Sequence, residues 1–153
     1  MSESDEFEHI TQNAKVEIYR ASNPIFDGLL KEVRELSRKK PEATMSPGKV
    51  KMINRVLGDL LDILKDQPTG KYLEILDDTA LPQMSDALLT MVQFESALRA
   101  FKSRFYRNVS GNMYWITDEL LKEWDEDAAV EDEEEEDEEE DIEDLAPSDD
   151  KDD

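Results

Sequence analysis

Apolar residues recur every three or four positions through most of residues 1–124, which is the spacing of one helix face and not the alternation of a strand. The longest such run extends from Gln83 to Tyr106. A helix turns by about 100° per residue, so its apolar positions fall on a single stripe. We predict a long helix here whose buried stripe consists of Met84, Ala87, Met91, Phe94, Leu98, Phe101 and Phe105.

Prolines and small polar residues separate the periodic runs and predict where further helices begin. A first helix is expected over residues 5–21. The pairs Asn23-Pro24 and Ser46-Pro47 each combine a capping side chain with a proline in the first turn, where a missing N–H costs nothing. They predict a second helix over residues 24–40 and a third from residue 47, the latter burying Val50, Ile53, Leu57, Leu60, Leu61 and Leu64.

Shorter elements are expected in the rest of this segment. A short helix is predicted over residues 71–76, a turn over residues 110–112 and an extended stretch over residues 113–116. Thr117 is a candidate cap for a last helix that ends near Trp124. The simplest packing of these elements is all-α: an antiparallel bundle of four to six helices with short loops.

Charge divides the chain into two parts. The 153 residues carry a net charge of −22, and residues 125–153 hold 20 acidic residues and one lysine, or −19. Residues 1–124 are left with −3. Long runs of like charge repel themselves and usually act as solvated interaction tails. We therefore expect a helical domain over residues 1–124 and a disordered polyacidic tail over residues 125–153.

The centre of the tail is a run of consecutive carboxylates that can occupy a lysine- or arginine-rich surface in place of phosphates. In composition, such a tail resembles those of histone chaperones, nucleic-acid-mimicking inhibitors and single-stranded-DNA-binding proteins. The main hypothesis is a non-enzymatic regulator or accessory subunit whose partner is a basic, nucleic-acid-handling protein. The expected binding residues are Glu131, Asp132, Glu133, Glu134, Glu135, Glu136, Asp137, Glu138, Glu139, Glu140 and Asp141.

Two positive clusters favour an alternative function. Cations at these positions could contact phosphates, and the tail would then act as an autoinhibitor of a nucleic-acid-binding helical domain. The possible basic patch consists of Arg34, Arg38, Lys39, Lys40, Lys102, Arg104 and Arg107. The nearby tryptophans, Trp115 and Trp124, are either a satellite core or anchors that face a partner.

Residue types that carry catalysis are scarce. The chain has no cysteine, and its single histidine, His9, is expected on the surface of the first helix. Two carboxylate doublets resemble in outline the Mg²⁺ site of all-α nucleoside triphosphate pyrophosphohydrolases. Helical projection points them toward water, so we expect no enzyme, metal or cofactor. A third possible function is an Mg²⁺-dependent phosphohydrolase, whose two carboxylate doublets would be Glu32 with Glu35 and Asp59 with Asp62.

The expected cellular compartment is inferred from the absence of targeting and membrane-spanning segments in the sequence. The chain shows no basic and apolar leader and no stretch of about 18 uncharged apolar residues. The expectation is a cytoplasmic protein, or a nuclear one in a eukaryote, with no membrane partner.

Overall fold

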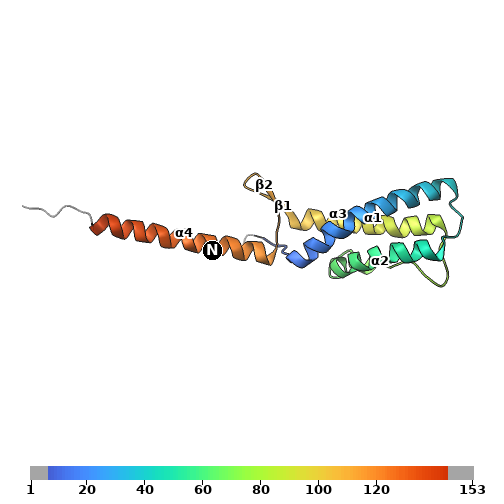
Figure 1. The fold of residues 1–153 in the computed structure, drawn as a ribbon, viewed down its shortest axis with the longest axis horizontal. Helices are drawn as coiled ribbons and strands as arrows, with labels where there is room; N and C mark the ends of the chain where they lie inside the picture. Colours follow the sequence, from blue (N-terminus) through green and yellow to red (C-terminus); the bar gives the residue numbers. More distant parts are fainter. Residues whose placement is uncertain (1–6, 145–153) are drawn as a thin grey trace, which may run out of the picture.

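The computed structural model describes residues 7–144, with side chains described over residues 7–136. This part of the chain is mostly helical, as predicted, but it also contains a two-stranded antiparallel sheet that an all-α fold does not include. Figure 1 shows three helices packed side by side and a fourth that projects away from them. The elements are α1 (Asn13–Lys39), α2 (Pro47–Leu64), the 3₁₀ turn η2 (Gly70–Tyr72), α3 (Met84–Phe105), β1 (Tyr106–Val109), β2 (Asn112–Trp115) and α4 (Asp118–Asp144).

The core lies between α1, α2 and α3, and α1 contacts both of the others. Every residue of the stripe predicted on α3 is buried. On α2 the predicted face is also correct except at one position, where Ile63 is buried and Leu61 is only half-buried. The largest side chains in this core, Phe26, Phe94 and Phe101, are at most 1% exposed. The periodicity of the sequence thus identified the packed faces of these helices.

The helix directions differ from the predicted antiparallel arrangement. α1 runs opposite to both neighbours, but α2 and α3 run the same way (Figure 1). Backbone hydrogen bonds join the loops in front of the two helices: the Met45 N–H donates to the Pro82 carbonyl, and the Met84 N–H donates to the Ala43 carbonyl. α2 and α3 therefore begin at the same end of the bundle, and the chain must return along its length between them.

Residues 65–83 make this return. Of the short helix predicted over residues 71–76, only Lys71 and Tyr72 are helical, within η2, and residues 73–77 continue without regular structure. Leu73 and Leu76 are buried in the core, which fixes the segment against the bundle. The Asn54 side chain on α2 holds it in both directions, accepting from the Leu76 N–H and donating to the Leu76 carbonyl, each at 2.9 Å. The backbone N–H and carbonyl of Leu76 are thus both paired by one side chain.

α1 is one helix of 27 residues where two were predicted, and Pro24 lies inside it. The helix also begins at Asn13 rather than near residue 5, so His9 precedes it. Proline removes the hydrogen bond to the carbonyl four residues earlier, here that of Arg20. The buried stripe nevertheless continues across this position, with Ser22 and Phe26 both facing inward. Burial of that stripe outweighs the local cost of the proline.

A tight hairpin follows α3 directly. Ser110 and Gly111 connect its strands, and both have positive φ, of 53° and 91°. Two central residues with positive φ give a turn whose twist matches that of paired strands. The strands pair from Tyr106 with Trp115 to Val109 with Asn112. The predicted turn and extended stretch are confirmed here, whereas Tyr106 belongs to β1 and not to the preceding helix.

α4 begins where predicted and continues farther than predicted. The Thr117 hydroxyl accepts from the Leu120 N–H at 3.1 Å, which confirms it as the cap. The helix then runs to Asp144, whereas the sequence placed a disordered tail from Asp125 onward. Residues 145–153 of that predicted tail lie outside the described residues. Along residues 7–144, no helix has the length and the apolar run that crossing a bilayer requires.

Replacing Pro24 by alanine should stabilise the protein, because alanine restores the missing hydrogen bond at an exposed position of α1. A gain of about 2–3 kcal/mol is expected in the free energy of unfolding, measured by urea denaturation. Pro47→Ala is the matched control, since Pro47 occupies the first turn of α2. Equal stabilities for the two variants would contradict this assignment.

Candidate interaction site

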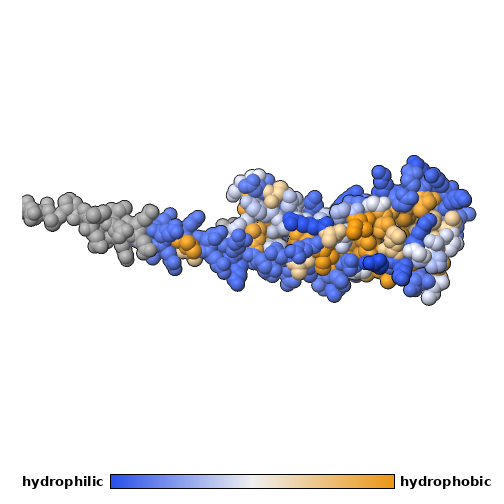
Figure 2. All heavy atoms as spheres, viewed as in Figure 1, coloured by the Kyte–Doolittle hydropathy of each residue, from blue (hydrophilic) through white to orange (hydrophobic). Residues whose placement is uncertain are grey.

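The outward part of α4, which we call the acidic arm (residues 125–144), consists mostly of aspartate and glutamate. Every residue from Glu126 to Glu136 is exposed, including six of the eleven predicted tail residues. The other five, Asp137–Asp141, lie on the helix, but their side chains are outside the described residues. In Figure 2 the described arm is almost wholly hydrophilic, whereas the bundle shows hydrophobic patches. The arm therefore offers carboxylates around its circumference.

The arm is attached to the bundle through the backbone of its first turn. Thr11, just before α1, forms a parallel bridge with Thr117. The Thr11 N–H donates to the Ile116 carbonyl at 2.9 Å, and the Asp118 N–H donates to the Thr11 carbonyl at 3.0 Å. Solvent has little access to this connection, because three of its residues are at most 5% exposed: Thr11, Thr117 and Leu121. We call this region, where α1, the hairpin and α4 meet, the junction.

Aromatic rings fill the junction and decide the roles of the two tryptophans. Trp115 packs on Tyr19, Phe101 and Tyr106 with ring centroids 5.0–5.9 Å apart, so it extends the core. Trp124 instead meets Tyr114 edge-on at 5.1 Å and is half-buried. Burial and the nearby Asp27 carboxylate raise the pKa of Tyr19. Trp115 is thus the satellite core that the sequence allowed, and Trp124 stays close to solvent.

A hollow of about 380 Å³, which we call the junction groove, opens between α1, the hairpin and α4. Its walls carry three carboxylates, from Glu17 on α1 and from Glu119 and Glu123 on α4. Glu119 also accepts a hydrogen bond from the Asn13 N–H at 3.1 Å. Three half-buried aromatic rings complete the lining: Tyr106, Tyr114 and Trp115. Sequence reasoning missed this groove because its carboxylates come from the two ends of the chain.

The predicted basic patch is divided between opposite ends of the bundle. Arg34, Arg38 and Lys39 lie in the last turns of α1 and Lys40 directly follows it, whereas Lys102, Arg104 and Arg107 lie at the end of α3 and in β1. Figure 1 shows these two ends at opposite sides of the bundle. α3 alone spans about 33 Å at 1.5 Å per residue. The seven cations therefore do not form one surface.

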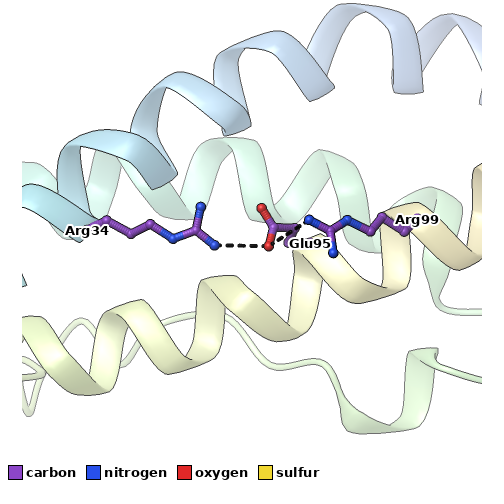
Figure 3. Close-up of polar contacts among 3 residues, drawn as sticks. All are labelled: Arg34, Glu95 and Arg99. Atoms are coloured by element: carbon purple, nitrogen blue, oxygen red, sulfur yellow. Dashed lines mark hydrogen bonds and ion pairs between the residues drawn. The ribbon is translucent and has the colours of Figure 1, made fainter.

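Several of these cations already have partners. Arg34 donates to Glu95 across the α1–α3 contact at 3.0 Å, and Arg99 approaches the same oxygen at 3.5 Å (Figure 3). Arg38 pairs with Glu35 one turn earlier. Lys102 lies over the Tyr106 ring, 5.3 Å from its centroid. The charges of Arg34 and Arg38 are thus paired within the bundle.

Arg104 and Arg107 are arranged differently. They line a hollow of about 370 Å³ together with Phe7, His9, Asn108 and one carboxylate, that of Glu8. Neither arginine has an ion-pair partner among the residues that the structure describes. Among the residues that the structure describes, Lys39 and Lys40 also form no ion pair, but Arg104 and Arg107 are the two members of the patch that share a hollow.

The carboxylate doublets do not converge. Glu32, Asp59 and Asp62 are exposed, and Glu35 is engaged with Arg38. Over the described residues, no three acidic, histidine or cysteine side chains are grouped as metal ligands. The lowered pKa of Asp77 results from the N–H groups of Thr79 and Ala80 in its own turn, followed by the Thr79 hydroxyl. That shift reflects a local loop and not a catalytic pair.

Comparison of the chain with protein families, with curated proteins and with solved structures finds no match.

Arg34→Ala should destabilise the protein by about 1 kcal/mol, because it removes the interhelical hydrogen bond to Glu95, whose side chain is only 17% exposed. Arg99→Ala is the matched control, since Arg99 reaches the same carboxylate from its own helix and is 78% exposed. Urea unfolding should separate the two variants. A larger loss for Arg99→Ala would show that the α1–α3 contact does not depend on Arg34.

Thr117→Ala should weaken the start of α4 by about 1 kcal/mol through loss of the cap, whereas Thr117→Ser, which keeps the hydroxyl, should not. Amide hydrogen exchange at residues 118–124 measures this directly. Identical protection in both variants would contradict the capping role.

Proposed function

We propose that this protein is a non-enzymatic interaction protein, a regulator or accessory subunit, whose acidic arm engages or shields a basic protein surface. The observation that carries the proposal is the way α4 leaves the bundle: residues 126–136 are exposed, and the backbone bridge between Thr11 and Thr117 fixes the start of the helix. Carboxylates in that position are free to approach another molecule. The partner is most simply a protein whose lysines and arginines otherwise bind nucleic acid.

The bundle supplies a surface for a more specific contact. Hydrophobic side chains reach its exterior (Figure 2), including Ile25 on α1 and Leu89 on α3, which are 58% and 63% exposed. Burial of apolar surface gives an affinity that changes little with salt concentration. The charge of the arm gives a long-range attraction that salt weakens. In the proposed division of labour, the arm accelerates encounter and the bundle fixes the complex.

Deletion of residues 128–153 should weaken binding to an oligoarginine peptide about tenfold or more at low salt, because most of the arm's charge is lost. Isothermal titration across a salt series should show a steep dependence for the full chain and a shallow one for the deletion. The matched control keeps the length and replaces the acidic residues between positions 131 and 141 by their amides. If both variants bound as the full chain does, the arm would not be the binding element.

A second candidate function is favoured by the hollow beside Arg104 and Arg107. Two arginines with no described carboxylate partner can contact phosphates, and the arm would then compete for them as an autoinhibitor. Here the same deletion should strengthen binding to a short DNA or RNA duplex at low salt. Arg104→Gln with Arg107→Gln should abolish that gain. A deletion that leaves nucleic-acid affinity unchanged would eliminate this candidate.

A further inference from the structure

From the walls of the junction groove we infer that it is the anchoring site for an arginine side chain of the basic partner. This inference rests on the proposed function and adds to it a specific position and a specific side-chain chemistry. The groove places carboxylates and aromatic rings around one hollow, and the guanidinium group is the protein cation that uses both at once. It forms paired hydrogen bonds with a carboxylate and stacks on an aromatic face.

The two chemical components come from different elements. Glu17 of α1 and Glu123 of α4 contribute exposed carboxylates, while Tyr114 and Trp115 of the hairpin contribute half-buried rings. Within the described part of the chain, neither Glu17 nor Glu123 forms an ion pair. Their carboxylates are therefore available to a cation that enters the groove.

Size limits what can enter. At about 380 Å³, the groove is near the lower end of the roughly 300–1,000 Å³ range typical of small-molecule sites. It admits a side chain with its flanking backbone and excludes a folded element. Lysine would gain the charge attraction but not the paired hydrogen bonds or the stacking, so the groove should prefer arginine.

The groove is also continuous with the arm. Glu119 and Glu123 border it, and Asp127 and Glu131 line a second hollow between α4 and the hairpin. These four residues follow one another at intervals of four, so they lie along one face of α4. An arginine in the groove would direct the neighbouring residues of an extended basic segment onto this row of carboxylates. The occupant is accordingly an arginine-containing basic segment of a partner protein.

One lining residue opposes the ligand. Arg20 of α1 borders the groove and has no ion-pair partner among the residues described. Its charge should repel an incoming guanidinium, so its removal should strengthen binding. A variant that loses its fold would bind more weakly, so tighter binding by an Arg20 variant could not result from unfolding.

The test uses the full chain with Trp124→Phe, which leaves Trp115 in the groove as the fluorescent reporter. Titration with tetra-arginine peptide should change the Trp115 emission. Glu17→Gln with Glu123→Gln should weaken that binding about tenfold, near the sum of two exposed ion pairs. Arg20→Gln should strengthen it about threefold, and tetra-lysine should bind several-fold more weakly than tetra-arginine.

The matched control is Glu32→Gln with Asp59→Asn, which changes the net charge equally at exposed positions on the bundle. Circular dichroism should show all variants folded, since each altered charged side chain is exposed and Trp124→Phe keeps an aromatic ring beside Tyr114. Equal weakening by the control and the groove variant would overturn the groove as the site, as would an unchanged Trp115 signal. Equal binding of the two peptides would overturn the choice of arginine.

The failure of this inference is distinguishable from failure of the proposed function. If deletion of residues 128–153 weakens binding but the groove variant does not, the arm acts without the groove and the general function stands. If neither change alters affinity for the oligoarginine peptide, both proposals are wrong.

Discussion

The parallel backbone bridge between Thr11 and Thr117 joins the helical bundle to α4. Two backbone hydrogen bonds and three nearly inaccessible side chains join the start of α1 to the start of α4. Buried backbone groups must be paired, so this joint resists opening. From this joint α4 projects away from the bundle instead of folding back along it (Figure 1). The groove, the exposed arm and the row of carboxylates all follow from that one attachment.

Two similar dipeptides show how far the fold follows from sequence. Ser46-Pro47 opens a helix as its chemistry predicts, with the Ser46 hydroxyl accepting from the Lys49 N–H. Asn23-Pro24 carries the same local signal and lies inside α1, because the buried stripe continues through it. Local capping rules hold when no longer-range burial competes. The parallel path of α2 and α3 had no local signal, since it depends on the contact of Asn54 with Leu76, 22 residues away.

The candidate site shows a related division. The charge of the tail is a property of neighbouring residues, so the sequence alone shows it. The junction groove combines residue 17 with residues near 115 and 120, and only the folded chain brings those together. The prediction of a basic patch failed for the opposite reason, because it grouped residues by their charge alone. These residues lie at both ends of the bundle. One of them, Arg34, pairs with Glu95 and so links α1 to α3. Residue type was a poor guide to proximity.

The energetics of α4 connect its structure to its proposed role. Asp118 and Glu119 in the first turn suit the positive end of the helix dipole, but the last turn contains acidic residues and no base. Like charges four residues apart cost about 0.2–0.5 kcal/mol per pair, and the arm contains many such pairs. The helix therefore becomes less favourable with distance from the junction. Cations of a partner would remove that repulsion, so binding a basic segment and stabilising the outer helix would reinforce each other. In the proposed function, attachment at the root and repulsion along the length would together make the arm responsive to the charge of its partner.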